Sequence, residues 1–500
     1  MTTLVRDWIV EWAAARPAVE AVVDPHARWT YAELEAVTRR MASALHAQGI
    51  GPSARIATLL GDGAAAVAVV HGVRRLGAIL VPLSRRAAPA ELAFQLAAAG
   101  ATVLIHDPER ADLARAAVVG GPTVPWLEVD RLLAGAQEDP DASVVRDEVD
   151  LDAAATIMFT SGTTGLPKGA VLSHGCHAAS ADAWAAVLGP RPSDRWLACL
   201  PLFHVAGLAM VIRASRWGVP LEVHDRFDPD AVDRALDGGV SHLSMVGVQL
   251  ERLLEIRAGR PVPATLRAVL LGGGPIPPAL VARALEHGLP VVPTYGLTET
   301  ASGVTALPAD MAARHPGSAG RALPGVELRV DRDGWPTGDG AIDDVGEIVV
   351  RGPMVFAGYA DQPDATTAVL REGWFHTGDV GRLDAEGYLT VLDRRDDLFV
   401  SGGENVYPAE IEAVLVAHPA VADAAVVGSP DPRWGAVPVA AIVVRPDAQV
   451  DDRILASHCR SRLAPFKVPV AFHRLAALPR TPAGKLLRGE VRALLPDGSR

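Results

Sequence analysis

The feature that most constrains the fold is a regular alternation, between about residues 55 and 295, of short apolar runs with longer Ala-rich amphipathic segments. The apolar runs are predicted to be strands, at residues 55–60, 78–83, 102–106, 156–161, 196–200, 221–224, 242–246 and 268–271. The amphipathic segments are predicted to be helices, including 63–75, 90–98, 229–238 and 277–287. Strands that alternate with helices form parallel sheets whose faces the helices cover. We therefore expect an α/β fold for this region.

Gly and Pro become frequent after residue 315, and the predicted strands shorten. They fall at 326–330, 346–350 and 388–392, which indicates a small, mostly antiparallel β-rich subdomain. From residue 408, mixed helix and strand resume over about ninety residues, which is enough for a separate α+β domain. The polar stretch 393–397 is the best linker candidate. We therefore expect a large N-terminal domain over 1–395 and a small C-terminal domain over 396–500.

Composition narrows the class of protein. Hydrophobic residues make up 49% of the chain and the formal net charge is −12, which argues against general binding to nucleic acid or to anionic membranes. The cysteines have no paired spacing, so neither a disulfide framework nor a cysteine zinc site is expected. Charged residues near the N-terminus and within the apolar region 56–83 argue against a secretory signal and a membrane span. We expect a cytoplasmic protein, and the sequence leaves its oligomeric state open, a homodimer included.

The strongest local signal is PheThrSerGlyThrThrGlyLeuProLysGly at 159–169, directly after a predicted strand. Its glycines allow backbone N–H groups to approach an anion, its hydroxyls add donors, and its lysine adds a positive charge. The residues that could hold a polyphosphate are Thr160, Ser161, Gly162, Thr163, Thr164 and Lys168. The loop is not a Walker A loop, because Pro167 stands where the second Gly belongs and Gly169 where the Mg²⁺-binding hydroxyl belongs. Transfer of a γ-phosphoryl group is thus disfavoured.

Further motifs follow this loop along the chain. They are TyrGlyLeuThrGluThr (295–300), TrpPheHisThrGlyAsp (374–379), LeuAspArgArgAspAspLeu (392–398), SerGlyGlyGluAsnValTyrProAlaGluIleGlu (401–412) and ProArgThrProAlaGlyLysLeuLeuArg (479–488). In this order they resemble the superfamily of acyl-CoA synthetases, peptide-synthetase adenylation domains and luciferases. The resemblance implies an enzyme that joins a carboxylic acid to ATP as acyl-AMP with release of pyrophosphate, and then passes the acyl group to a thiol. It also implies ATP, Mg²⁺ and coenzyme A as small-molecule partners beside the acid.

The same resemblance implies which residues bind ATP. Glu299 would help to hold Mg²⁺, since a carboxylate beside a polyphosphate needs a cation between them, and Thr298 would contact the α-phosphate. Asp379 would accept hydrogen bonds from the ribose hydroxyls, with Arg394 as a second ribose contact. The glycines at 272–274 would let the backbone approach a flat adenine. The remaining ATP-binding candidates are therefore Gly272, Gly273, Gly274, Tyr295 and Gly296.

Two roles are implied for the C-terminal region, which in this superfamily is a mobile lid. Lys485, which on composition alone would be a solvated surface charge, matches the catalytic lysine that stabilises negative charge on the α-phosphorus. No general base is needed, because a carboxylic acid is already ionised at neutral pH. Asp396 matches the hinge about which the small domain rotates between the two half-reactions. The segment turned toward the site for thioester formation includes Gly402, Gly403 and Glu404.

The segment LeuProLeuPheHisValAlaGly (200–207) bears on the identity of the acid. His204 stands where the superfamily places a gate between the nucleotide and acyl pockets, and where amino-acid-activating members have an Asp, so an amino acid is disfavoured. Finer stretches resemble the subfamily of o-succinylbenzoate–CoA ligases of menaquinone biosynthesis. In that case Arg213 would pair with the second carboxylate of the acid. The alternative is an Arg at the solvent end of a helix.

One segment departs from that subfamily. Gly247 and Val248 stand where that subfamily more often has Pro-Thr or Gln-Thr, in a segment that helps to shape the acyl pocket. The loss of a hydroxyl and the gain of space leave another aryl or fatty acid open. No carrier-protein signature follows residue 488, which favours coenzyme A, but a free-standing enzyme that loads a separate carrier protein is an alternative. A catalytically inactive nucleotide-binding protein is disfavoured, because the chain keeps Lys168, Glu299, Asp379, Arg394 and Lys485.

Overall fold

The structure is a computed structural model of the 500-residue chain. It describes residues 3–134, 144–160, 167–274, 276–332, 345–394, 397, 399–401, 404–406, 408–431, 434–446, 448–463, 465–480 and 486–495. For residues 393, 394, 400, 404 and 405 it describes the backbone alone.

The first large sheet has seven strands in the order β20–β10–β9–β5–β4–β6–β7. Strands β9 to β7 are parallel, and β10 and β20 extend one edge in the antiparallel sense. Their bounds are β4 (Arg55–Leu59), β5 (Ile79–Pro82), β6 (Val103–His106), β7 (Trp126–Glu128), β9 (Ala154–Thr160), β10 (Lys168–Ser173) and β20 (Gly358–Tyr359).

The second large sheet has nine strands in the order β17–β16–β15–β14–β13–β11–β12–β2–β3, of which β15 to β2 are parallel. Their bounds are β2 (Glu20–Val23), β3 (Arg28–Thr30), β11 (Trp196–Ala198), β12 (Leu221–Val223), β13 (His242–Met245), β14 (Ala268–Leu271), β15 (Val291–Tyr295), β16 (Thr305–Ala306) and β17 (Arg321–Ala322). A separate antiparallel pair joins β1 (Leu4–Arg6) to β8 (Glu148–Asp150).

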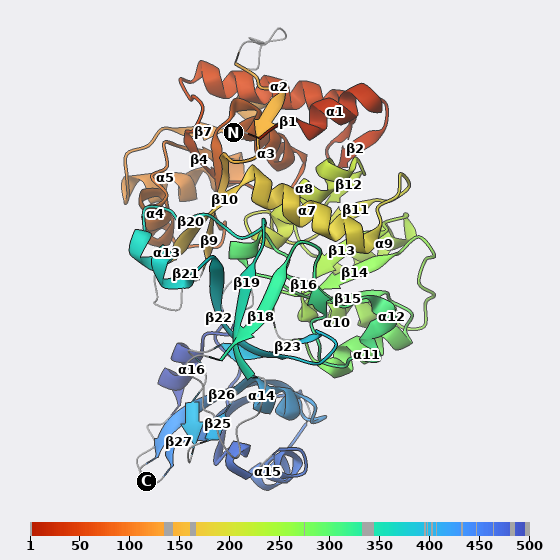
Figure 1. Cartoon of the computed structure of the whole chain (residues 1–500), viewed down its shortest axis with the longest axis vertical. Coiled ribbons are helices and arrows are strands. Elements are labelled where there is room, and N and C mark those ends of the chain that lie inside the picture. The colour runs from red at the N-terminus through yellow and green to blue at the C-terminus, as the bar shows by residue number, and fades with distance from the viewer. Residues whose placement is uncertain are drawn as a thin grey trace.

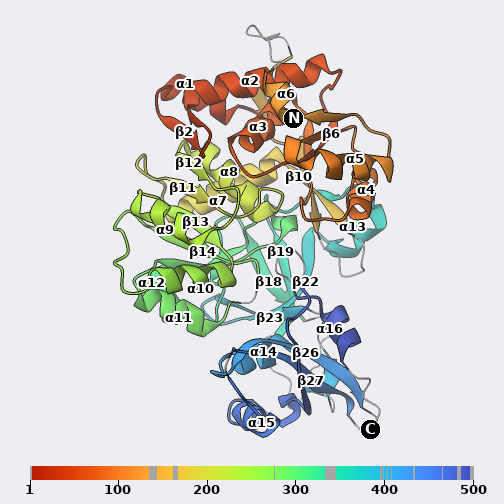
Figure 2. The same cartoon turned by 180° about the vertical axis from the view of Figure 1, so that it is seen from behind.

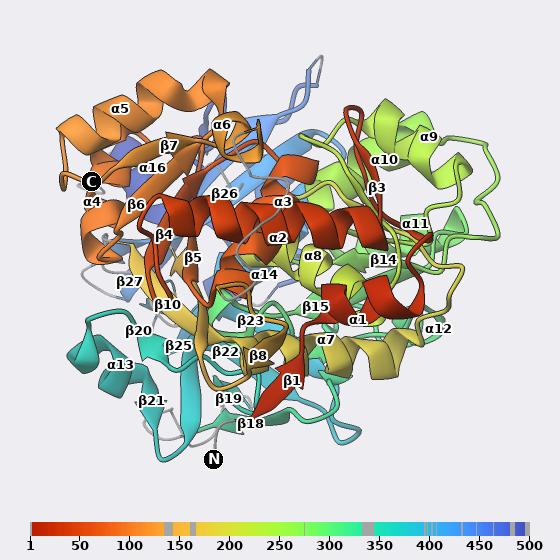
Figure 3. The ribbon, with the colours of Figure 1, turned by 90° about the horizontal axis from the view of Figure 1, so that it is seen from above.

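Helices cover both sheets, and α1 and α2 lie across one end of the molecule (Figure 1, Figure 3). Helix α2 begins at a complete capping box, because Thr30 and Glu33 satisfy each other's backbone N–H groups. One continuous apolar core includes residues of both sheets and of α7 and α8, with Trp184 and Trp196 among its fully buried members. The helices of this region are α1 (Trp8–Ala15), α2 (Tyr31–Ala47), α3 (Ala64–Leu76), α4 (Pro89–Ala98), α5 (Ala111–Val119), α6 (Val129–Ala134), α7 (His174–Leu188), α8 (Val205–Trp217), α9 (Pro229–Asp237), α10 (Gly247–Ile256), α11 (Pro278–Glu286), α12 (Ala309–Ala312) and α13 (Pro363–Val369).

An antiparallel sheet follows, in the order β18–β19–β22–β21 with β23 paired to β22. Its bounds are β18 (Glu327–Asp331), β19 (Val345–Arg351), β21 (Leu370–Arg371), β22 (Trp374–Leu383) and β23 (Leu389–Arg394). It lies between the large sheets and the C-terminal part of the chain (Figure 1).

The C-terminal part gathers at the end of the molecule opposite α1 and α2, as Figure 1 and Figure 2 both show. Its sheet has the order β25–β24–β27–β26, and β28 pairs with β27. Among the described residues it shares no strand with the other sheets. Its elements are β24 (Phe399–Ser401), β25 (Glu404–Val406), α14 (Pro408–Val416), β26 (Val421–Asp431), β27 (Gly435–Val444), α15 (Asp452–Arg460), β28 (Ala471–Arg474) and α16 (Arg488–Leu494).

The fold class expected from the sequence is confirmed: parallel sheets under helices, then a β-rich subdomain, then a smaller α+β part. Each of the eight predicted strands between 55 and 271 coincides with an observed strand. Each of the four predicted helices named above coincides with an observed helix. No helix among the described residues is long and apolar enough to cross a membrane.

Candidate active site

Strands β9 and β10 form an antiparallel hairpin, and the predicted phosphate loop is the segment that joins them. Thr160 at the end of β9 and Lys168 at the start of β10 are register partners. The Lys168 ammonium lies 5.3 Å from the centroid of the Tyr359 ring in β20, a cation–π contact. The hairpin and β20 therefore hold the lysine at the base of the loop. The rest of the predicted phosphate site lies outside the described residues: Ser161, Gly162, Thr163 and Thr164.

The motif that contains Glu299 forms a short 3₁₀ turn, Thr298–Thr300, directly after β15. The two residues after it, Ala301 and Ser302, have φ values of 46° and 74°. This left-handed conformation costs a non-glycine residue about 1–3 kcal/mol and clusters at functional sites. The Ser180 hydroxyl in α7 donates to the Ala301 carbonyl oxygen at 2.8 Å and helps to hold the turn.

The Glu299 side chain is buried within this turn. Its Oε1 accepts a hydrogen bond of 2.8 Å from the Tyr359 hydroxyl. Its carbonyl oxygen accepts a second, of 2.8 Å, from the backbone N–H of Phe356. Glu299 and Lys168 thus contact different parts of one tyrosine, the hydroxyl and the ring face.

The two predicted ribose residues are neighbours in one antiparallel ladder. Asp379 in β22 and Arg394 in β23 are register partners, although the Arg394 side chain is outside the described residues. Asp379 is buried, and its Oδ2 accepts a hydrogen bond of 2.7 Å from the Tyr295 hydroxyl. The structure therefore brings together the ends of two motifs that are 84 residues apart.

Asp379 lies inside strand β22 and not at its end. Strand β22 continues to Leu383, and the ThrGlyAsp motif forms a bulge at which the register to β19 shifts. Gly378 takes a φ of 71° there, and its N–H donates to Glu347 Oε1 at 2.9 Å. The Thr377 hydroxyl donates to a carbonyl of β19 at 2.7 Å. Because side chains replace the missing ladder bonds, the strand resumes beyond the bulge.

The predicted adenine glycines follow β14 at the carboxyl end of the second sheet. Gly272 leaves no room for a side chain, since a Cβ there would lie 2.5 Å from Thr294 Oγ1. Gly273 and Gly274 are exposed, and nothing lies within 4 Å of a Cβ on Gly274. Gly296 is tightly packed as well, because its Cβ would lie 2.8 Å from the carbonyl carbon of Ser302.

His204 is the N-cap residue immediately before α8, and its ring packs on Phe203 at 4.4 Å between centroids. Burial, and then the positive charge of Arg86, lowers the pKa of His204 to about 4. Its imidazole is therefore neutral at pH 7 and carries no charge to pair with an anion.

Arg213 lies inside α8 and is 2% exposed, so the alternative of a solvent-end arginine is wrong. Its guanidinium lies over the rings of Trp184 (4.9 Å) and Trp196 (5.9 Å), and Nη2 donates to Ser302 Oγ at 3.1 Å. It makes no ion pair within the described part of the chain, and its Nε has no hydrogen-bond partner there. Burial lowers the pKa of Arg213 to about 9, so the side chain stays charged at pH 7.

Known proteins resemble the chain along most of its length. The profile of the AMP-binding enzyme family matches residues 9–360, and that of the AMP-binding enzyme C-terminal domain matches 410–485. The chain belongs to the AMP-binding enzyme family.

Relatives of this AMP-binding enzyme carry a more specific name. A 2-succinylbenzoate–CoA ligase of Bacillus cereus (strain ATCC 14579) is 39% identical over 495 residues, covering 98% of both chains. One of Geobacillus kaustophilus is 40% identical over 501 residues, covering 99% of both. Among solved structures, the o-succinylbenzoate CoA synthetase of Bacillus subtilis with its acyl-adenylate intermediate gives a TM-score of 0.91 at 38% identity, over 98% of each chain. The same enzyme with ATP and magnesium gives 0.91 at 37%, over 98% of this chain and 100% of that one.

The Glu299 carboxylate is a suitable ligand for the Mg²⁺ that accompanies ATP in this family. Mg²⁺ prefers one or two carboxylates together with phosphate oxygens and water, rather than a cage of protein ligands. Among the described residues no group of three or more His, Cys, Asp or Glu could form such a cage. A single buried carboxylate beside the base of the phosphate loop therefore fits the ion.

Two polar residues of the site were not predicted from the sequence. Tyr359, which contacts both Lys168 and Glu299, lies outside the motifs that carried the resemblance. Glu347, which holds the bulge beside Asp379, is 32 positions before it along the chain and has no sequence signal of its own.

In the C-terminal part, Glu404 has only its backbone described. The other predicted residues of that part lie outside the described residues: Asp396, Gly402, Gly403 and Lys485.

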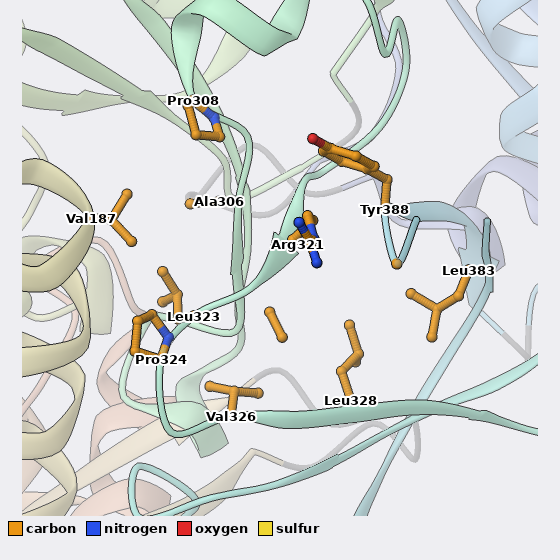
Figure 4. Close-up of a pocket in the computed structure, with 12 residues that line it drawn as sticks. Val187, Ala306, Pro308, Arg321, Leu323, Pro324, Val326, Leu328, Leu383 and Tyr388 are labelled. Carbon is orange, nitrogen blue, oxygen red and sulfur yellow. The ribbon is translucent and has the colours of Figure 1, made fainter. Parts of the chain in front are cut away.

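The acyl-pocket candidate Gly247 begins α10, and only Leu280 Cδ2, at 3.5 Å, lies within 4 Å of a Cβ placed there. The segment therefore leaves open space, as its small residue predicts. A cavity of about 590 Å³ lies elsewhere, beside β16, β17 and the turn after β22. None of the predicted site residues lines it; apolar side chains, Arg321 and Tyr388 do (Figure 4).

Proposed function

We propose that the chain is an ATP- and Mg²⁺-dependent o-succinylbenzoate–CoA ligase. In the first half-reaction a carboxylate oxygen of the acid attacks the α-phosphorus of ATP, and pyrophosphate leaves. In the second half-reaction the thiol sulfur of coenzyme A attacks the acyl carbon, its proton is lost, and AMP leaves. The named relatives support this assignment over the whole length of the chain.

Arg213 is the observation that carries the assignment of the acid. A buried guanidinium without a carboxylate partner is strongly unfavourable unless an anion joins it. Its Nη2 donates to Ser302 Oγ, and Ser302 follows the proposed metal residue Glu299 by three positions in the chain. An acid with a second carboxylate supplies the missing charge, and a monocarboxylic acid does not.

The chain's other residues divide the work of adenylation. Lys168 and the loop before it would bind the phosphates, Asp379 would bind the ribose, and neutral His204 would separate the nucleotide from the acyl pocket. Mg²⁺, held by Glu299, would offset negative charge on the phosphates. Lys485 would add a positive charge at the pentacoordinate α-phosphorus, where removing one such contact typically lowers the rate about 100-fold or more.

The test of Arg213 pairs one substitution with one change in the substrate. Wild type and Arg213→Gln are compared on o-succinylbenzoate and on 4-oxo-4-phenylbutanoate, which lacks the ring carboxylate. Loss of a charge-assisted contact should lower kcat/KM for o-succinylbenzoate by about 10- to 100-fold in the variant. For 4-oxo-4-phenylbutanoate, the variant should have the same kcat/KM as wild type. Equal losses on both acids would refute the pairing and favour another aryl or fatty acid.

Coenzyme A is proposed as the acceptor because the named relatives are CoA ligases. A separate carrier protein is the alternative. AMP release that depends on coenzyme A, with no stimulation by a panel of phosphopantetheinylated carrier proteins, would support the proposal. Stimulation by a carrier and none by coenzyme A would reverse it.

We further propose that residues 396–500 form a lid that rotates about Asp396 between the half-reactions. The support is that the C-terminal sheet shares no described strand with the rest of the molecule. If so, Lys485→Ala should abolish pyrophosphate release and leave thioester formation from supplied acyl-AMP nearly unchanged. Equal loss of both half-reactions would contradict the rotation.

A further inference from the structure

Tyr359 connects the two charged groups of the proposed MgATP site. It belongs to β20, which pairs with β10, and Ala170 and Tyr359 are register partners. The backbone on either side is fixed as well, since Ala360 N–H donates to Gly169 O at 2.8 Å and Phe356 N–H donates to Glu299 O at 2.8 Å. The position of the ring is thus set by the strand that carries Lys168 and by the turn that carries Glu299.

Each end of the tyrosine meets a different charge. The hydroxyl donates to Glu299 Oε1 at 2.8 Å, which fixes the orientation of the carboxylate. The ring face lies 5.3 Å from Lys168 Nζ. Lys168 makes no ion pair with Glu299 or with any other described carboxylate. Both charged side chains contact the same tyrosine, and a direct lysine–glutamate ion pair would occupy the groups that the metal and the phosphates need.

We propose that Tyr359 is a positioning residue for MgATP, which orients Glu299 toward the metal and holds Lys168 away from that carboxylate. This inference rests on the proposed function only in taking Glu299 as the metal residue. Side chains that orient a metal ligand in this way typically change metal affinity by about 10- to 100-fold when they are replaced. The hydroxyl and the ring have separable tasks, so two substitutions distinguish them.

The test measures binding without the acid, so the identity of the substrate does not affect it. Mn²⁺ stands in for Mg²⁺, and electron paramagnetic resonance reports the Mn²⁺ bound to the enzyme–ATP complex. Tyr359→Phe keeps the ring and should raise the Mn²⁺ dissociation constant about 10-fold, with little change in ATP affinity measured in excess EDTA. Tyr359→Leu also removes the ring, and it should weaken ATP binding in EDTA, because Lys168 is no longer held.

Controls separate this role from simple packing. Tyr31→Phe also removes a tyrosine hydroxyl, which donates to the carbonyl oxygen of Val219 at 3.3 Å. This control should change neither the Mn²⁺ nor the ATP dissociation constant. Glu299→Gln should raise the Mn²⁺ constant by itself, and adding Tyr359→Phe to it should produce no further rise. If Glu299→Gln had no effect, the metal assignment would be at fault. An unchanged Mn²⁺ constant in Tyr359→Phe, with Glu299→Gln impaired, would overturn the proposal for Tyr359.

Discussion

Asp379 and Tyr295 show how single residues from distant motifs form one hydrogen-bonded pair in the proposed ribose site. The tyrosine hydroxyl donates to one carboxylate oxygen at 2.7 Å, and Thr377 Oγ1 lies 3.1 Å from the Asp379 backbone N–H. The carboxylate is therefore held in one orientation before a nucleotide arrives. A preoriented acceptor loses little further freedom when the ribose binds.

Asp379→Asn should raise KM for ATP by about 10-fold, because an amide accepts a weaker hydrogen bond than a carboxylate does. 2′-Deoxy-ATP and 3′-deoxy-ATP, each of which lacks one ribose hydroxyl, identify the contact. For the analogue that lacks the hydroxyl bonded to Asp379, the substitution should raise KM by a smaller factor than it does for ATP. If the variant raised KM for ATP and both analogues by the same factor, Asp379 would not bind the ribose.

The sequence pointed to some of the candidate site residues and not to others. Lys168, Glu299 and Asp379 were predictable because each lies in a motif whose order along the chain is specific. Arg213 was predicted with an alternative, and only its burial excludes the solvent-end position. Tyr359 was missed, because its partners are 60 residues or more away and no local pattern reports that distance.

At the scale of elements, the turn after β15 brings residues proposed to bind the nucleotide and the acid into one short stretch. Gly296, Thr298, Glu299 and Ser302 all lie within it, and Ser302 reaches Arg213 in α8. Apolar periodicity predicted the neighbouring strands β13 and β14 and the helix α11, because strands and helices that pack against each other bury apolar faces, but β15 was not among the predicted strands. It could not predict the bulge in β22, where hydrogen bonds from side chains replace those of the ladder.

Gly296→Ala should disrupt the turn, since its Cβ would lie 2.8 Å from the Ser302 carbonyl carbon. We expect a loss of about 1–3 kcal/mol in the free energy of unfolding, as in other overpacked sites, together with a large fall in pyrophosphate release. Gly51→Ala is a matched control, because no atom lies within 4 Å of a Cβ there. Urea unfolding and the activity assay measure both effects. Wild-type behaviour of Gly296→Ala would contradict the close packing.

At the scale of the whole molecule, buried histidines make the stability depend on pH. Burial, and then the charge of Arg74, lowers the pKa of His177 to about 4, from about 6.5 in an unfolded chain. The pKa of His174, in the same helix, is lowered to about 3, again mainly by burial. A group whose pKa is lowered by folding contributes stability that is complete above about pH 6.5 and is lost as pH falls through its folded pKa.

We expect His177 alone to lower the free energy of unfolding by roughly 3 kcal/mol between pH 7 and pH 4. Urea unfolding at pH 7, 5.5 and 4 measures this change. In His177→Gln, which can keep a hydrogen bond to Thr156, the decline with falling pH should be shallower than in wild type. Parallel declines in the two proteins would show that His177 does not carry the effect.

The central claim is that the chain activates o-succinylbenzoate and transfers it to coenzyme A. The most direct measurement is coupled pyrophosphate release over a panel of o-succinylbenzoate, benzoates, and short to medium fatty acids, with and without coenzyme A. We predict that o-succinylbenzoate has the highest kcat/KM, and that its CoA thioester and AMP form in equal amounts only when coenzyme A is present. If o-succinylbenzoate is inert while a monocarboxylic acid turns over, the account of Arg213 and of the acid is contradicted.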